Sequence, residues 1–153
     1  MIKQLIALCL LTVAFSAQAK DSLLRATDFS NTDSHQNKHV YVVLVSRYDC
    51  SYCDLVREDF LLPLERQANR AYPAQIRELK VDSNKLLVDF DGAQISPKKF
   101  AARYNASFTP TLLFLNQDGA QVHQKLVGIS NKEFYGYYLD QAIEQSYRAL
   151  NTQ

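Results

Sequence analysis

Cysteine, net charge and long apolar runs are all scarce in this chain. Only three of its 153 residues are cysteine, and its 17 basic residues nearly balance its 16 acidic ones. A chain so close to neutral gives no indication of binding to nucleic acid or to an anionic membrane surface. Its main apolar stretch, residues 5–15, falls well short of the roughly 20 residues that a membrane-spanning helix needs. Low-complexity tracts, internal repeats and interdomain linkers are also missing, which favours one domain.

The N-terminus has the three parts of a secretory signal peptide. Lys3 gives it a positive charge, residues 5–15 form an apolar centre, and Ala17-Gln18-Ala19 matches a cleavage site. We therefore predict a signal peptide over residues 1–19 and a single domain over residues 20–153. The alternative is a short N-terminal helix of a cytosolic protein.

Cleavage at this site would change the cysteine count and the charge. It removes Lys3, which leaves 16 residues of each sign, and it removes Cys9. Cys50 and Cys53 are then the last two cysteines, in an oxidising compartment where a disulfide can persist. They must pair with each other or with other molecules.

The first half of the mature chain predicts strand, helix and strand. Residues 40–46 (VYVVLVS) are mostly β-branched and nearly all apolar, as in a central strand buried on both faces. From Tyr52 onward the apolar residues recur at helical spacing, so a helix should start near Cys50. Pro63 should kink or end that helix, because proline lacks the backbone N–H. Residues 75–82 (QIRELKVD) are a second strand candidate.

The second half predicts a helix, a hairpin and a last helix. Ser96-Pro97 is a typical helix start, and Asp118-Gly119 between residues 111–115 and 120–127 indicates a β-hairpin. Ser130 to Glu133 matches a capping box, followed by a helix to about Leu150. That helix would place Phe134, Tyr138, Ala142 and Ile143 on one side. The element order predicts an α/β domain with a mixed sheet flanked by helices.

The spacing of Cys50 and Cys53 favours redox chemistry. The first turn of a helix can hold two thiols at this spacing either as a disulfide or as free thiols, after a small adjustment of that turn. As a structural staple the bond would be weak, since a loop this short contributes roughly 2 kcal/mol. The helix N-terminus stabilises a thiolate, which predicts Cys50 as the nucleophile. Cys53, one turn later, would then resolve the mixed disulfide.

Two other interpretations of the cysteines remain open. The first is a binding module in which Cys50 and Cys53 form a structural disulfide. The second is a metal site, either with His35 and His39 as zinc ligands or with His123 in a copper carrier. Surface histidines are the simpler explanation of these positions, so we predict no metal and no cofactor.

The ordered set of motifs resembles a thioredoxin-like protein. It comprises an apolar strand, CxxC at a helix start, Thr109-Pro110-Thr111 before another apolar strand, the Asp118-Gly119 hairpin, and Val127-Gly128 before the last helix. The resemblance covers residues 39–150. The sequence Cys-x-Tyr-Cys, Arg57-Glu58 and the DFDG insertion at 89–92 are similar to the SoxW-like secreted thioredoxins.

The resemblance implies a site, a direction and partners. Pro110 matches the family's cis-proline, and Thr109, Pro110 and Tyr52 would bind the substrate. The SoxW-like likeness implies a periplasmic reductase of disulfide-containing client proteins, recharged by a membrane thiol-reducing electron donor. We also expect a monomer, because the family's dimeric isomerases carry an added domain that this chain lacks.

Three positions depart from the family pattern. Asp49 stands where thioredoxins usually have tryptophan, and its charge should oppose a thiolate at Cys50, with Arg47 as an offset. Leu44 replaces the usual buried aspartate, and the lysine that normally faces it matches Glu78. We therefore expect that Glu78 either handles protons for the second cysteine or faces solvent at an edge.

Overall fold

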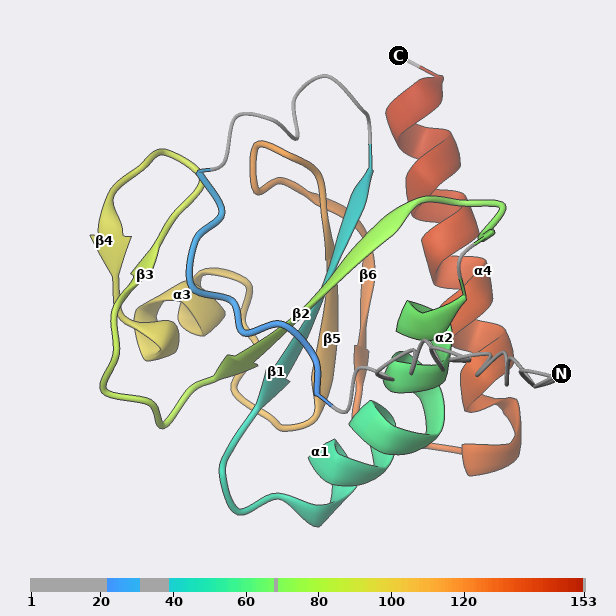
Figure 1. Cartoon of the computed structure of the whole chain (residues 1–153), viewed down its shortest axis with the longest axis horizontal. Coiled ribbons are helices and arrows are strands. Elements are labelled where there is room, and N and C mark those ends of the chain that lie inside the picture. The colour runs from blue at the N-terminus through green and yellow to red at the C-terminus, as the bar shows by residue number, and fades with distance from the viewer. Residues whose placement is uncertain (1–21, 31–38, 68, 153) are drawn as a thin grey trace, which may run out of the picture.

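The computed structural model describes residues 22–30, 39–67 and 69–152. The predicted signal peptide and His35 lie outside the described residues. The main sheet has four strands in the order β2-β1-β5-β6 (Figure 1). They are β1 (Val40–Ser46), β2 (Ala74–Lys80), β5 (Thr111–Leu115) and β6 (Gln121–Val127). β1 runs parallel to β2 and antiparallel to β5, and β5 pairs antiparallel with β6, so the predicted mixed sheet is confirmed.

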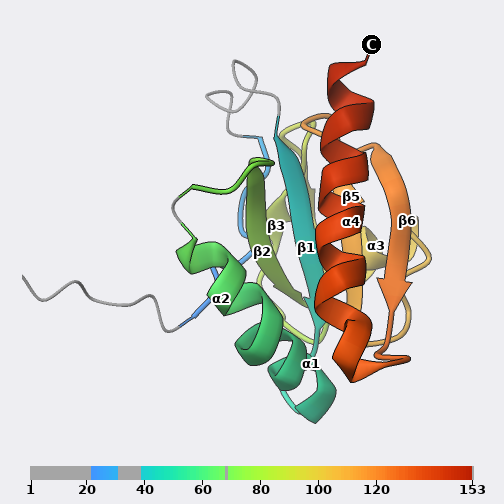
Figure 2. The ribbon, with the colours of Figure 1, turned by 90° about the vertical axis from the view of Figure 1, so that its right-hand side faces the viewer.

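Strand β1 is buried along its whole length and separates two apolar cores. Val42 and Leu44 face one core, whereas Val43 and Val45 face the other, as the alternation of a strand requires. The first core lies under the helices after β1 and under α4 (Lys132–Asn151), which Figure 2 shows on one face of the sheet. The second lies under α3 (Pro97–Arg103).

The helix after β1 runs through Pro63 instead of ending there. It consists of α1 (Ser51–Leu55), a π-helical segment η2 (Val56–Leu61) and α2 (Leu62–Arg66). The N–H of Leu62 bonds to the carbonyl of Arg57, five residues back. Because this change of register starts a new α-helical turn, Pro63 lies in the first turn of α2, where a missing N–H costs little.

The side of α4 on which the sequence placed four residues is buried only in its second half, at Ala142 and Ile143. Asn131 caps the helix, since its side chain accepts a bond from the N–H of Glu133, and the predicted cap Ser130 lies outside. The buried residues are Tyr135, Leu139, Ala142, Ile143 and Ser146, whereas Phe134 and Tyr138 are exposed. The row of Tyr135, Leu139 and Ile143 packs on the sheet instead.

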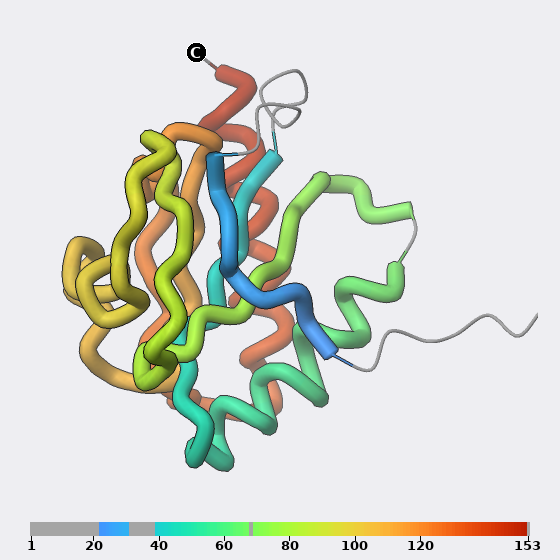
Figure 3. The backbone as a smooth tube through the Cα atoms, turned by 60° about the vertical axis from the view of Figure 1, so that its left-hand side comes forward, coloured from blue at the N-terminus to red at the C-terminus, as the bar shows by residue number. Residues whose placement is uncertain are grey.

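Two pieces of the fold were not predicted. One is a small hairpin of β3 (Leu87–Val88) and β4 (Gln94–Ile95). The other is residues 22–30, which run along the outer edge of β2 (Figure 3). There Glu78 donates its N–H to Leu24 and accepts from the N–H of Ala26. Within the part of the chain described, no helix has the length and apolar character to cross a membrane.

Candidate active site

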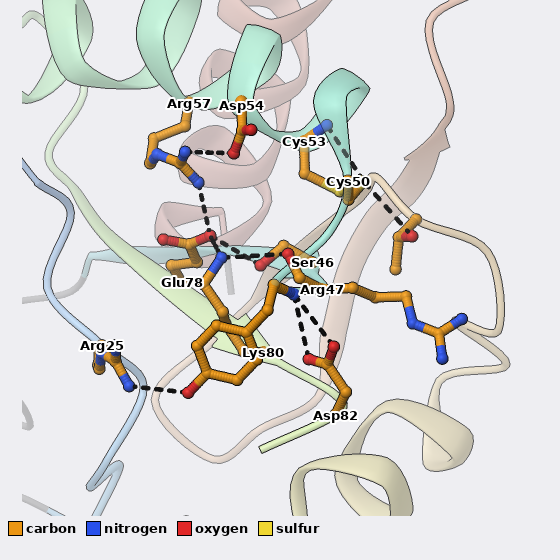
Figure 4. A network of polar contacts seen from close by, with 12 residues as sticks. Arg25, Ser46, Arg47, Cys50, Cys53, Asp54, Arg57, Glu78, Lys80 and Asp82 are labelled. Carbon is orange, nitrogen blue, oxygen red and sulfur yellow. Dashed lines mark hydrogen bonds and ion pairs between the residues drawn. A yellow bond between two sulfur atoms is a disulfide. The ribbon is translucent and has the colours of Figure 1, made fainter.

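The two cysteines lie where the chain turns from the end of β1 into α1. Cys50 is the N-cap of α1, in an extended conformation, and its Sγ accepts a bond of 3.3 Å from the N–H of Cys53. The two sulfurs form a disulfide with an S–S distance of 1.98 Å and a Cα–Cα distance of 5.2 Å (Figure 4). The predicted helix start and the pairing of Cys50 with Cys53 are therefore confirmed.

The two sulfurs differ in access to solvent. Cys50 is partly exposed, whereas Cys53 is fully buried with 0% exposure. A bulky disulfide substrate can therefore reach only Cys50. The N–H of Cys53 already points at the Cys50 sulfur, as a donor that would stabilise a thiolate there must do.

The loop before β5 lies opposite the disulfide. The Thr109–Pro110 peptide bond is cis, as the resemblance implied. Oγ1 of Thr109 is 3.6 Å from Sγ of Cys50, so the structure brings these two predicted residues together. Pro110 is buried, and its carbonyl accepts a bond of 2.8 Å from the N–H of Gly128.

Two aromatic side chains near the disulfide are strongly exposed. Tyr52, between the cysteines, is 65% exposed, and Phe108, directly before Thr109, is 74% exposed. The sequence singled out Tyr52 but not Phe108, although the latter stands in the same motif as the cis-proline. Large exposed apolar side chains are typical of contact surfaces.

Glu78 is buried, with 7% exposure, in a polar cluster beneath α1. Its Oε1 accepts a 2.7 Å bond from the hydroxyl of Ser46 and lies 3.0 Å from both Arg57 and Lys80. These four residues are called the Glu78 cluster below (Figure 4). In the sheet register Glu78 is opposite Leu44, as the resemblance implied. The alternative in which Glu78 faces solvent at an edge is wrong, because its carboxylate contacts the rest of the cluster and residues 22–30 pair with that edge of β2.

The electrostatics of the cluster keep Glu78 charged. Burial raises its pKa, but hydrogen bonds from Ser46 and Lys80 and the charges of Lys80 and Arg57 outweigh burial, so the pKa is lowered. Arg57 also pairs with Asp54 on α1. The cluster therefore ties the helix that carries Cys53 to β2. Sequence reasoning missed Ser46, Arg57 and Lys80, although a serine ending a buried apolar strand is a signal of such a site.

The histidines considered as metal ligands lie elsewhere. His39 precedes β1, at the end opposite Cys50, and its ring packs against Tyr41 with centroids 4.7 Å apart. His123 lies on β6, where its ring bonds to the carbonyl of Gln124 and the side chain of Gln145. Over residues 22–30, 39–67 and 69–152, no group of three or more His, Cys, Asp or Glu side chains is placed to hold a metal ion.

Comparison with known proteins agrees with this geometry. Residues 28–143 match the family of thioredoxin-like domains. No curated protein matches the chain. A thioredoxin variant from Halobacterium salinarum is 21% identical, with a TM-score of 0.54 over 85% of this chain and 95% of that chain.

Two further solved structures have the same fold. A thioredoxin-fold protein from Helicobacter pylori is 19% identical, with a TM-score of 0.54 over 89% of this chain and 91% of its own. Mitochondrial thioredoxin 3 from Saccharomyces cerevisiae, in its oxidised form, is 16% identical, with a TM-score of 0.52 over 80% of this chain and 93% of its own. At such identities these likenesses establish the fold alone.

Proposed function

The chain belongs to the thioredoxin-like family, and from that premise we propose that it is a thiol–disulfide oxidoreductase working as a reductase. The observation that carries the proposal is the asymmetric disulfide, with Cys50 reachable and Cys53 buried at the start of one helix. The cis Thr109–Pro110 loop lies against the reachable sulfur, where a client chain would have to pass.

The first step uses the reduced form of the protein. The thiolate of Cys50 attacks one sulfur of a client disulfide, the client S–S bond breaks, and the other client sulfur leaves as a thiolate. A mixed disulfide now joins Cys50 to the client. The N–H of Cys53, 3.3 Å from Sγ of Cys50 in the oxidised form, supports negative charge on the attacking sulfur.

The second step releases the client. The thiolate of Cys53 attacks Sγ of Cys50, the mixed disulfide breaks, and the second client sulfur leaves as a thiolate. Two electrons have then passed to the client, and the protein holds the Cys50–Cys53 disulfide seen in the structure. Thr109, Pro110, Tyr52 and Phe108 would contact the client around this bond.

We further propose that Glu78 influences the second step. Its place supports the role, because Glu78 is buried beneath the helix that carries Cys53 and pairs there with Arg57. Its lowered pKa makes it a weak proton acceptor, and its negative charge would by itself oppose a thiolate at Cys53. Its effect would therefore come from the position that it gives the cysteine helix through Arg57.

The proposed setting is the periplasm, with a membrane protein as the electron donor. It rests on the signal-peptide pattern of residues 1–19 and on the SoxW-like resemblance. A reductase in an oxidising compartment must be recharged from outside that compartment, since the local pool does not supply electrons at a low enough potential. Clients would be disulfide-containing proteins of the same compartment.

Insulin reduction tests the proposed function directly. The protein without residues 1–19, kept reduced by excess dithiothreitol, should speed the precipitation of the insulin B chain over the rate with dithiothreitol alone. A rate equal to that of dithiothreitol alone would reject a general disulfide reductase.

A further inference from the structure

A pocket lies between α3 and the ends of β1 and β2, and we call it the α3 pocket. Its volume is about 400 Å³, within the range of roughly 300–1,000 Å³ that is usual for binding pockets. Its apolar lining comes from Val81 and from small residues, Ala101, Ala102 and Ala106. The small side chains of this part of α3 and of the loop after it leave the space open.

Two chain segments that line the α3 pocket lead directly to the disulfide and to the cis-proline loop. Arg47, which lines the pocket, precedes Cys50 by three residues. Ser107, also in the lining, precedes Thr109 by two residues, and Thr109 is 3.6 Å from the Cys50 sulfur. The pocket therefore opens at the same end of the sheet as the reachable cysteine.

The rim of the α3 pocket carries an excess of positive charge. Arg47 and Lys98 are exposed, and no carboxylate of the described residues forms an ion pair with either of them. Figure 4 shows the Arg47 side chain extending away from the Glu78 cluster. The one acidic lining residue, Asp82, accepts bonds of 3.1 and 3.3 Å from the N–H of Tyr48.

We propose that the α3 pocket receives a short acidic segment of the client polypeptide, next to the client cysteine. The proposal rests on the proposed function and names its substrate preference. The two cations outnumber the one carboxylate of the lining, Asp82, so the rim still favours an anion. A glutamate suits this site, because its methylene stem is apolar like the floor and its carboxylate can reach the rim. The volume is larger than a single inorganic anion needs, which favours a peptide segment.

The test compares three disulfide-linked peptides that differ only beside the cysteine, with Glu-Glu, Gln-Gln or Lys-Lys. For the reduced wild-type protein, kcat/KM should be about tenfold higher for the Glu-Glu than for the Gln-Gln peptide, and lowest for the Lys-Lys peptide, because complementary charge speeds encounter and lowers the free energy of the complex. The preference should shrink when salt is raised, since exposed charges are screened.

Single substitutions locate the preference in the pocket. Arg47→Gln and Lys98→Gln should each lower the Glu-Glu to Gln-Gln ratio about threefold, as expected for one exposed charge pair. Lys99→Gln is the matched control, because Lys99 is an exposed neighbour on the same helix that does not line the pocket. Equal kcat/KM for the two peptides, or a ratio unchanged in the Arg47→Gln, Lys98→Gln double variant, would overturn the proposal.

A binding experiment separates this proposal from the redox function. A Glu-Glu peptide with serine in place of cysteine is titrated into the Cys50→Ser, Cys53→Ser protein and followed by fluorescence anisotropy. Its Kd should rise about threefold with Lys98→Gln and stay the same with Lys99→Gln. A Kd that does not change with Lys98→Gln would overturn the pocket proposal, even if the wild-type protein reduces peptides. If the wild-type protein reduces no peptide but the Kd still rises with Lys98→Gln, the reductase function is rejected and the binding of acidic segments in the pocket is supported.

Discussion

The two sulfurs of the disulfide have different chemical environments although they are three residues apart. Cys50 is partly exposed and bonded to the N–H of Cys53, whereas Cys53 is buried in the apolar core. Accessibility and charge stabilisation thus favour the same residue as the nucleophile.

Substituting the two cysteines in turn should give different results. Cys50→Ser should abolish insulin reduction, because the buried Cys53 cannot reach a client. Cys53→Ser should accumulate a mixed disulfide between Cys50 and the client, visible by mass spectrometry without reductant. Full activity of Cys50→Ser would contradict the assignment of the nucleophile.

The carboxylate of Glu78 allows a separate test of the second step. Glu78→Gln should slow the release of client from the mixed disulfide tenfold or more above neutral pH, measured by stopped-flow single turnover. The reason is the loss of the charged partner that holds Arg57, and with it the helix that carries Cys53, in place. Asp59→Asn is the control, because Asp59 is an exposed carboxylate of the same helix that pairs with Lys132 and not with the Glu78 cluster. An unchanged release rate in Glu78→Gln would reject this role.

The sequence predicts some site residues far better than others. Cys50, Cys53 and Pro110 belong to local motifs, and a motif can be identified without the fold. The surroundings of Glu78 could not be predicted, because Ser46, Arg57 and Lys80 come from β1, the cysteine helix and β2 and meet only after folding. The burial of Glu78 depends on these same partners and on residues 22–30, which pair with the edge of β2 through backbone atoms that leave no side-chain pattern.

Among the elements, the β5–β6 hairpin packs against the insertion before α3. Gly119 in the hairpin turn has φ of +78°, and a Cβ built there would lie 2.5 Å from the ring of Phe90. Gly92, in the β3–β4 turn, has φ of +82° but has no atom within 4 Å of a built Cβ. Both glycines therefore have a left-handed backbone conformation, but only Gly119 is packed against a side chain.

Alanine at these two positions should separate backbone strain from overpacking. Gly92→Ala should lower the free energy of unfolding by about 1–2 kcal/mol, the cost of a left-handed conformation. Gly119→Ala should cost about 1–3 kcal/mol more, because Phe90 must also move. Urea denaturation measures both, and equal losses would show that the contact with Phe90 is easily relieved.

The accuracy of the element predictions followed the strength of the local signal. The strand at 111–115 was predicted to the residue, because Thr111 and four apolar residues lie between a proline and a turn. The face of α4 was misassigned, since the row through Phe134 and Tyr138 is as aromatic as the row through Tyr135 that packs on the sheet. The π-helical segment before Pro63 has no sequence pattern of its own.

At the scale of the whole molecule, the Glu78 cluster links three elements around one charge. Glu78 on β2 bonds to Ser46 on β1 and to Arg57 on the cysteine helix. Because one buried carboxylate holds these parts together, the stability of the whole domain should respond to its protonation.

The lowered pKa of Glu78 predicts an acid-sensitive contribution to stability. A carboxylate whose pKa is lower in the folded than in the unfolded protein stabilises the fold fully above its ordinary pKa of 4.5. This stabilisation is lost as pH falls through the folded pKa. Between pH 6 and pH 3 the free energy of unfolding should therefore fall more steeply in the wild type than in Glu78→Gln. Parallel curves from urea titrations would contradict this.

The central claim is that Cys50 and Cys53 form a redox-active pair and not a structural bond. Its most direct test is the midpoint potential of the protein without residues 1–19, equilibrated in thiol redox buffers and read by alkylation of free cysteines. The account predicts a midpoint near about −200 mV or slightly lower, within the range of working oxidoreductases. A bond that stays oxidised well below about −300 mV would contradict it and identify a structural disulfide in a binding module.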